Sequence, residues 1–221
     1  VGKGANSVEG NTVLGETALD AITTGTLNTA IGKNALTDLT TGTRNVAVGK
    51  DAGGNISTGD DNVVVGQGAL STLTTGDKNT AVGKGSLTLA TTSSNNTAIG
   101  YDALNANTTG ADNVAVGSYA LDANTTGTRN TAVGDQCLTS NIDGEYNIAV
   151  GHKAMELNTI GRRSTAVGAF ALRTQDPASS SIVANTAVGY AAAYANTTGV
   201  YNTAVGAYAK YNITTGSNCT A

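Results

Sequence analysis

Apolar and polar residues recur along this chain with a period of 17 residues. The motif Asn-Thr-Ala-Val-Gly, or a close variant, begins at twelve points, and one step between motifs is longer, at 21 residues. The full repeat is N-T-A-V-G-x-x-A-L-x-x-N-T-T-G-x-x, and we number its positions from 0, the Asn, to 16. Such a period predicts an array in which each copy packs on its neighbours. The motifs begin at Asn11, Asn28, Asn45, Asn62, Asn79, Asn96, Asn113, Asn130, Asn147, Ser164, Asn185 and Asn202.

The repeats organise almost the whole chain. Residues 11–218 hold the twelve complete copies, and residues 219–221 begin a thirteenth. Residues 1–10 correspond to the end of a preceding, shorter repeat. The long step contains an insertion at residues 174–183, which holds the only Pro. Because both ends of the sequence fall inside a repeat, we expect the chain to be a segment of a longer fibre.

Glycine marks two corners in each repeat. Position 4 is Gly in all twelve copies, which indicates a positive φ or a very close approach of another backbone. Position 14 is mostly Gly, with Ser93 as an exception. Two corners predict two extended segments per copy, N-T-A-V and a second through A-L, as in one turn of a two-sided β-roll. A helical solenoid is disfavoured, because this spacing leaves no room for a helix of about 10 residues. The position-4 glycines are Gly15, Gly32, Gly49, Gly66, Gly83, Gly100, Gly117, Gly134, Gly151, Gly168, Gly189 and Gly206.

The alternation within N-T-A-V assigns residues to two faces of a strand. Positions 1 and 3 are mostly β-branched, and we expect them to point into the roll and meet the leucines of position 8. Position 2 is almost always Ala, so we expect it to face the backbone of a neighbouring chain. Since one thin roll has little interior, several rolls would pack around a common axis with this Ala stack inward. The stack is Ala30, Ala47, Ala81, Ala98, Ala115, Ala132, Ala149, Ala166, Ala187 and Ala204.

Composition supports an all-β array and excludes several function classes. The chain has 29 Gly, no Trp, 13% charged residues and a net charge of −4. This weak acidic balance gives no electrostatic basis for binding nucleic acid. No apolar run approaches the roughly 18 residues of a membrane-spanning helix, so we expect no membrane insertion by this segment. Two cysteines, Cys137 and Cys219, make no disulfide framework and have no metal-ligand spacing.

The N-T-A-V-G-x-x-A-L copies resemble the repeats of phage-type tail fibres and, through the related core N-S-V-A-I-G, the heads of YadA-like trimeric autotransporter adhesins. The resemblance covers essentially the whole chain, although the 17-residue unit is longer than the adhesin unit. It implies a left-handed parallel β-roll, three chains per fibre, and a role in attachment or host recognition. The expected location is extracellular, on a cell surface or a phage-like virion.

Catalytic and metal-binding patterns are weak in this sequence. His152 is the only histidine and lies at a variable position, where solvated side chains are the rule. The pair Asp60 and Asp61 lies in a turn. Gly-Lys pairs such as Gly32-Lys33 lack the spacing of a phosphate-binding loop. We therefore expect no enzymatic activity, no metal site and no cofactor.

The C-terminal half holds the candidate binding surface. All eight tyrosines lie after residue 100, and two of them, Tyr194 and Tyr211, share position 9, so their rings should stack. Exposed aromatic ladders bind sugar rings or protein partners, whereas the alternative is that they cover a flank between chains. Insertions in repeat arrays often map to binding faces. The candidate surface is Phe170, Asp176, Pro177, Tyr190, Tyr194, Tyr208 and Tyr211.

Three functions are consistent with these patterns. The first is a structural segment of an extracellular trimeric fibre that projects an adhesive tip, with copies of itself as partners. The second is an adhesin head with a host-surface glycan or protein bound on this segment. The third is ice binding by a ladder of the Thr-Thr turns, of which Thr23-Thr24 and Thr40-Thr41 are the first two.

Overall fold

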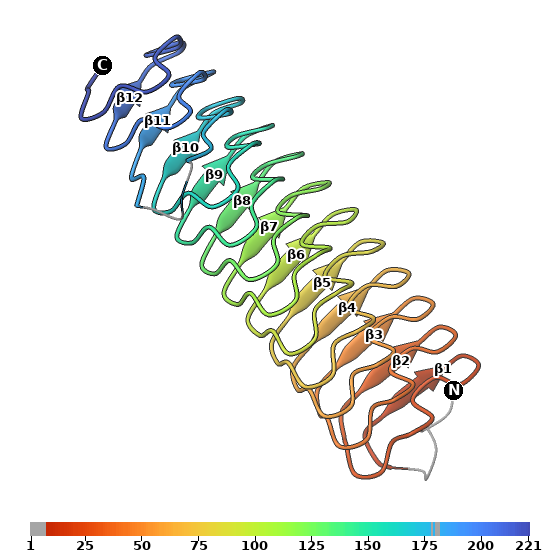
Figure 1. Ribbon diagram of the computed structural model, residues 1–221. Coiled ribbons are helices and arrows are strands. Elements are labelled where there is room, and N and C mark those ends of the chain that lie inside the picture. The colour runs from red at the N-terminus through yellow and green to blue at the C-terminus, as the bar shows by residue number, and fades with distance from the viewer. Residues whose placement is uncertain (1–7, 178, 180–181) are drawn as a thin grey trace. The chain divides into compact units, whose positions relative to one another are not determined.

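The chain forms two compact units, Val1–Ala111 and Asp112–Ala221 (Figure 1). A computed structural model describes residues 8–177, 179 and 182–221. In the described residues each unit is a parallel β-solenoid with one three-residue strand per 17-residue turn and no helix. Most of the expected shorter repeat at 1–10 lies outside the described residues, and each of the twelve repeats that follow contributes one strand.

The strands coincide with positions 1 to 3 of successive repeats. Within each unit, neighbouring strands pair in parallel and in register, so that Thr12 lies beside Thr29 and Ala30 beside Ala47. Unit 1 contains β1 (Thr12–Leu14), β2 (Thr29–Ile31), β3 (Val46–Val48), β4 (Val63–Val65), β5 (Thr80–Val82) and β6 (Thr97–Ile99). Unit 2 contains β7 (Val114–Val116), β8 (Thr131–Val133), β9 (Ile148–Val150), β10 (Thr165–Val167), β11 (Thr186–Val188) and β12 (Thr203–Val205).

The invariant glycines all have a positive φ, and most of them also meet the condition of close approach, which Gly206 in the last complete turn does not. Their φ angles lie between +124° and +147°, a range that side-chain-bearing residues rarely adopt. In addition, a Cβ on Gly49 would come within 2.8 Å of the carbonyl oxygen of Gly66, the same position one turn on. Position-14 glycines have only the second constraint: a Cβ on Gly59 would lie 2.4 Å from the Gly76 oxygen. The two corners therefore require Gly for different reasons: backbone conformation and close approach at position 4, and close approach alone at position 14.

The second extended segment of each repeat is absent from the described residues, which corrects the expectation of a two-sided roll. The A-L segment forms a turn in which positions 6 and 8 have left-handed backbone, as at Asn34 (φ 57°) and Leu36 (φ 50°). Hydrogen bonds between turns hold this conformation, since the Leu36 N–H donates to the Ala52 oxygen at 3.1 Å. Gly is not required at these positions, but Gly68 and Gly85 at position 6 and Gly53 at position 8 adopt the same positive φ, and these glycines were the sequence signal for the turn.

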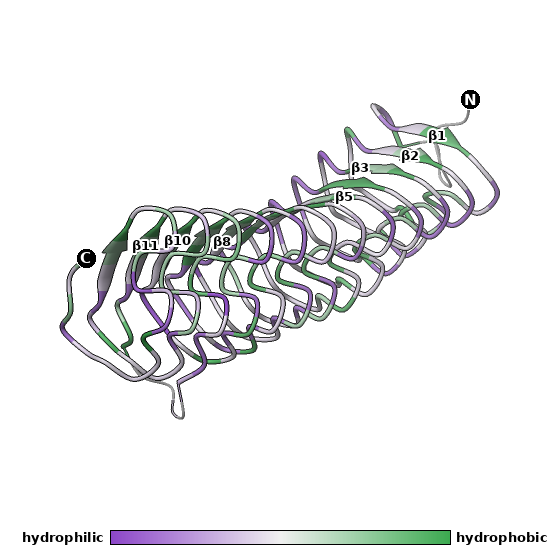
Figure 2. Ribbon diagram, turned by 90° about the horizontal axis from the view of Figure 1, so that it is seen from above, coloured by the Kyte–Doolittle hydropathy of each residue, from purple (hydrophilic) through white to green (hydrophobic). Residues whose placement is uncertain are grey.

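The two faces of the strands are reversed relative to the expectation. Position-2 side chains, including Ala115 and Ala132, are fully buried inside the single chain, so they do not form an interchain stack. Positions 1 and 3 point outward. The Leu residues of position 8 are interior as expected, and there they require small partners across a narrow core. Figure 2 shows the strand residues as mostly apolar and several turns as hydrophilic. The alanines concerned are Ala30, Ala47, Ala81, Ala98, Ala115, Ala132, Ala149, Ala166, Ala187 and Ala204.

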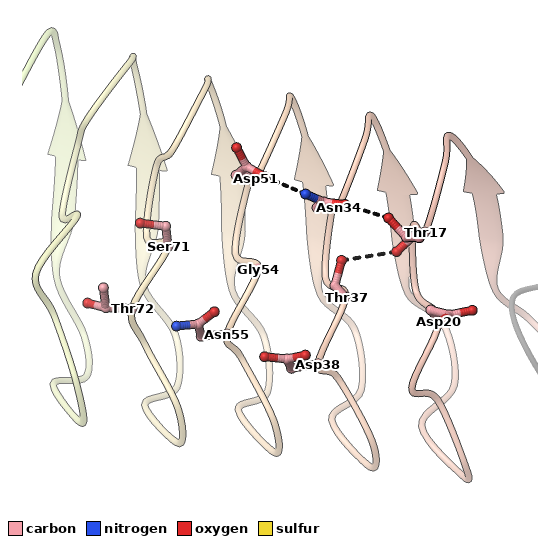
Figure 3. Close-up of a pocket in the computed structure, with 10 residues that line it drawn as sticks. All are labelled: Thr17, Asp20, Asn34, Thr37, Asp38, Asp51, Gly54, Asn55, Ser71 and Thr72. Carbon is pink, nitrogen blue, oxygen red and sulfur yellow. Dashed lines mark hydrogen bonds between the residues drawn. The ribbon is translucent and has the colours of Figure 1, made fainter.

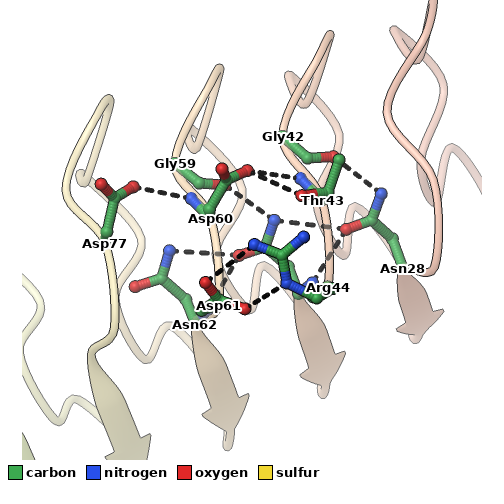
Figure 4. A network of polar contacts seen from close by, with 10 residues as sticks. Asn28, Gly42, Thr43, Arg44, Gly59, Asp60, Asp61, Asn62 and Asp77 are labelled. Carbon is green, nitrogen blue, oxygen red and sulfur yellow. Dashed lines mark hydrogen bonds and ion pairs between the residues drawn. The ribbon is translucent and has the colours of Figure 1, made fainter.

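Buried asparagines link the turns (Figure 4). The Asn45 backbone N–H donates to Asn28 Oδ1 at 2.9 Å, and Asn28 Nδ2 donates to the Gly42 oxygen at 2.9 Å. The same two bonds recur at Asn62, whose Nδ2 reaches the Gly76 oxygen at 3.0 Å. Position 0 is thus Asn because its amide satisfies two backbone groups that the narrow interior cuts off from water.

The insertion leaves the strand register intact, because Thr165 of β10 still pairs with Thr186 of β11. Gln175 stands where neighbouring turns have Asn, and its longer side chain donates to Asn158 Oδ1 and accepts from Asn185 Nδ2, both at 3.0 Å. Within the insertion, residues 178, 180 and 181 lie outside the described residues. The described part of the insertion is therefore a bulge, and the hydrogen bonds between buried amide side chains of successive turns continue past it.

Candidate functional site

Each unit has a groove at the corner formed by repeat positions 6 to 10. In unit 1 the groove has a volume of about 510 Å³ and a polar lining (Figure 3). Asn34 Nδ2 donates to Asp51 Oδ1 at 2.8 Å, and Thr37 Oγ1 donates to the Thr17 oxygen at 3.0 Å. The bond from Asn34 lowers the pKa of the Asp51 carboxyl. The lining is Thr17, Asp20, Asn34, Thr37, Asp38, Asp51, Gly54, Asn55, Ser71 and Thr72.

In unit 2 the corresponding corner is an aromatic cleft of about 280 Å³. Two rows of rings line it. The first row comes from positions 5 and 6, and the second comes from position 9. Ala191 lies between them at position 6, where its short side chain leaves room. We call this site the aromatic cleft, and its lining is Phe170, Tyr190, Ala191, Tyr194, Tyr208 and Tyr211.

The rings contact one another in two geometries. Tyr194 and Tyr211 stack, with centroids 5.0 Å apart and planes at 17°, which confirms the expectation from their shared repeat position. In the first row, Tyr190 meets Phe170 at 5.8 Å and Tyr208 at 5.3 Å, edge to face in both cases. Tyr208 also approaches Tyr211 at 5.6 Å and so joins the two rows. Edge-to-face and offset contacts are the favourable arrangements of aromatic pairs.

A charged pair lies beside the second row. Arg173 donates from its Nε to Glu156 Oε2 and from Nη1 to the Tyr194 hydroxyl, both at 2.5 Å. Its guanidinium also lies over the rings of Tyr194 and Phe170, 5.6 and 6.0 Å from the centroids. Hydrogen bonding to Glu156 raises the pKa of Arg173. The carboxyl of Glu156 has a lowered pKa, because bonds from Arg173 and Lys153 outweigh the opposing effect of burial.

Sequence reasoning missed Arg173 and Glu156, although the repeat carries the signal. Both stand at position 9, directly before Tyr194 and Tyr211 in the same column, so tabulating that column would have grouped them. His152, at position 5, belongs to the other row: its ring meets Phe170 edge to face at 5.3 Å, and its Nδ1 lies 3.1 Å from Asp135 Oδ2.

Asp176 and Pro177 are not part of the aromatic cleft. Asp176 occupies position 12, where its Oδ1 accepts from Thr159 Oγ1 at 2.5 Å and its backbone N–H donates to the Thr197 oxygen. Pro177 is buried near Gly161, where an added Cβ would lie 3.2 Å from the Pro177 ring. The structure therefore brings together Phe170, Tyr190, Tyr194, Tyr208 and Tyr211 but separates these two residues of the insertion from them.

The outward faces of the strands form a second candidate surface in each unit. We define the sheet face as the side chains of repeat positions 1 and 3. In unit 1, Val63 and Ile99 are 38% and 39% exposed. In unit 2, Ile148 is 44% exposed and Val167 is 37% exposed. Thr, Val and Ile therefore form columns on the solvent side of β1–β6, and likewise of β7–β12, within a single chain.

Polar features singled out by the sequence are used in turn-to-turn bonding. Asp61 pairs with Arg44 through two bonds of 2.5 and 2.9 Å, and this contact lowers the pKa of the Asp61 carboxyl. The neighbouring Asp60 accepts from the Thr43 N–H at 2.7 Å (Figure 4). Cys137 is buried, and burial raises the pKa of its thiol to about 12.

Among the described residues, no three or more His, Cys, Asp and Glu side chains gather in an arrangement suited to a metal ion. That same part of the chain contains no helix with the length and apolarity to cross a membrane. Comparison with protein-family models, with curated proteins and with solved structures gave no match. The candidate surfaces are therefore interpreted from their own chemistry.

Proposed function

We propose that this chain is a structural segment of an extracellular trimeric fibre, in which three copies pack through their sheet faces and the fibre presents an adhesive tip. The left-handed winding implied by the sequence resemblance is part of the proposal. The observation that carries it is the sheet face: a regular set of aliphatic side chains, among them Val63 and Val167, exposed on a single chain.

Exposed apolar patches of this kind usually mark interaction surfaces rather than solvent-facing ones. Position 3 is Val, Ile or Leu in every repeat, although a solvent-exposed position could equally be polar. Large polar side chains are absent from positions 1 and 3, although they occur at the corners of the turns. A surface that repeats identically every 17 residues suits packing against identical copies around an axis along the stack.

The interior supports the role of a spacer. Each turn satisfies its polar backbone through the next, by the strand bonds and by the asparagine ladder. A repeat that depends mainly on its neighbours can be added or removed without redesign of the rest. Ice binding by the Thr-Thr turns gains no such support, because Thr23 and Thr74 donate their hydroxyls to carbonyl oxygens of the following turns, at 2.9 and 3.0 Å.

The test is the mass in solution of the chain and of a charge variant. We expect the chain, of 21.9 kDa, to sediment as a trimer. Val116→Asp with Val133→Asp places like charges on the sheet face and should give monomers with unchanged circular dichroism. Ser118→Asp is the matched control, because position 5 already holds Asp135 in another turn. A monomeric parent chain, or a trimer that tolerates both Asp residues, would contradict the proposal.

A further inference from the structure

The groove of positions 6 to 10 belongs to the repeat, but its aromatic lining does not. In unit 1, position 6 is occupied by Thr17, Asn34 and Asp51, and position 9 by residues as small as Gly54 and Ser71. The turn is the same there, with left-handed backbone at position 6 as in unit 2. The fold therefore does not require rings at these positions, and their concentration in the last turns of unit 2 needs another explanation.

The rings leave substantial surface open to solvent. Tyr190 is 48% exposed, Tyr208 is 58% exposed and Tyr211 is 37% exposed. Tyr208 and Tyr211 belong to the last complete turn, whereas Tyr190 has a complete turn after it, and its contacts with Phe170 and Tyr208 at 5.8 and 5.3 Å still leave about half of its surface open. The rings are therefore not closed against one another. Instead they surround a cleft of about 280 Å³, just under the roughly 300 Å³ at which pockets for whole drug-sized molecules begin. A group of the size of a single ring fits such a space.

The lining combines apolar faces with a polar rim. Each Tyr presents a flat ring and a hydroxyl that both donates and accepts hydrogen bonds. Arg173 is fixed beside the cleft by Glu156 and Tyr194. Because Glu156 neutralises that guanidinium, the site does not favour an anion. A ligand that matches has one apolar face for stacking and hydroxyls at its edge, and hexopyranose sugars have this shape: their C–H groups form the face and their hydroxyls form the rim.

We propose that the aromatic cleft binds a neutral saccharide, with the C–H face of one hexopyranose ring against the ring of Tyr208, the most exposed of the cleft, and its hydroxyls bonded to the phenol groups of Tyr194 and Tyr211. Tyr194 is the anchored member, held by Arg173. Tyr190 and Phe170 form the opposite wall, and Ala191 provides the space. The aromatic cleft lies at the corner of the turn and not on the sheet face. Binding of a saccharide there therefore does not depend on the packing of sheet faces between chains.

The test uses saturation-transfer difference NMR on the intact chain. The probes are methyl β-galactopyranoside, methyl β-glucopyranoside and methyl α-mannopyranoside, with adenosine as a competing flat ring. We expect saturation of the C–H protons on one face of at least one sugar. The variant replaces the rings with residues that the repeat itself uses at the same positions: Tyr194→Thr as at Thr37, Tyr208→Asn as at Asn34, and Tyr211→Ser as at Ser71.

This variant should keep the melting temperature within a few degrees and bind the sugar about tenfold more weakly. The control is Tyr201→Asn, which removes an exposed tyrosine at position 16, where Asn95 stands in another turn, and should leave the sugar signal unchanged. Absence of saturation with all three sugars, or a signal that persists in the triple variant, would overturn the proposal. Saturation of adenosine but of none of the sugars would assign the cleft to a nucleobase instead. If the parent gives no sugar signal and the triple variant differs from it in oligomeric mass, the rings form a contact between chains and the proposal is wrong.

Discussion

At the scale of single residues, the solenoid depends on groups that satisfy the backbone where turns meet. Asn at position 0 bonds to the backbone of two turns, as Asn28 does with Asn45 and Gly42. Gly at position 4 combines positive φ with close approach to the next turn, whereas Gly at position 14 has the close approach alone. Ser93 at position 14 shows that a small side chain is accommodated at the second corner, where it accepts from Asn107 Nδ2 at 3.3 Å.

This difference predicts unequal effects of one substitution at two corners of the same turn. Gly49→Ser should destabilise unit 1 more than Gly59→Ser, by about 1–3 kcal/mol, because only the first forces a side-chain-bearing residue into φ near +137°. Chemical denaturation followed by circular dichroism measures both free energies of unfolding. Equal losses at the two corners would show that steric contact alone, and not backbone conformation, fixes the invariant Gly.

At the scale of the strand, alternation identified the two faces but not which one is interior. Ala and β-branched residues are both apolar, so the period of two is satisfied by either orientation. The interior is decided by space: Leu36 and its equivalents fill the narrow core from position 8, so that position 2 holds a small side chain, Ala in most turns and Val at Val64. The burial of position 2 therefore follows from the segment at position 8 of the same repeat, and not from the alternation within the strand itself.

The orientation predicts opposite outcomes at neighbouring residues of β8. Ala132→Leu should cost about 1–3 kcal/mol in the free energy of unfolding, because it overpacks a side chain that has no exposed surface. Val133→Leu should change the stability of the isolated chain by less than about 0.5 kcal/mol, since position 3 points outward and is already Leu at Leu14. Thermal and urea denaturation under conditions where the chain is monomeric measure both. If Val133→Leu proved the more damaging, the assignment of faces would be wrong.

Much of the fold was predictable from the repeat, because register and length are encoded in its period. The strand positions, the corner at Gly49 and the stack of Tyr194 on Tyr211 all follow from counting 17 residues. The left-handed turn was indicated at position 6 by Asn34, Gly68 and Gly85, whereas position 8 is mostly Leu, and residues such as Leu36 are poor indicators of positive φ. The rings of the aromatic cleft were predicted from the sequence, and Arg173 was predictable but missed, because it occupies the same position 9 as Tyr194 and Tyr211.

At the scale of the whole molecule, the account assigns different tasks to different surfaces of the same repeat. The interior of Ala, Leu and Asn holds successive turns together within each unit. The sheet face is proposed to join copies, and the aromatic cleft of unit 2 is proposed to hold a saccharide. The repeat allows this division because each position recurs on one line along a unit, so a surface changes character without altering the core.

In the proposed fibre the sheet face, and not another surface, lies between the copies. The most direct measurement is crosslinking with a trivalent maleimide in a background of Cys137→Ser and Cys219→Asn, residues that the repeat uses at those positions in Ser86 and Asn202. Around a three-fold axis, equivalent sheet-face residues of the three chains approach one another. Val133→Cys should therefore give a covalent trimer, whereas Thr126→Cys, at an exposed turn, should give only labelled single chains. Single chains from Val133→Cys, or trimers only from Thr126→Cys, would contradict the account.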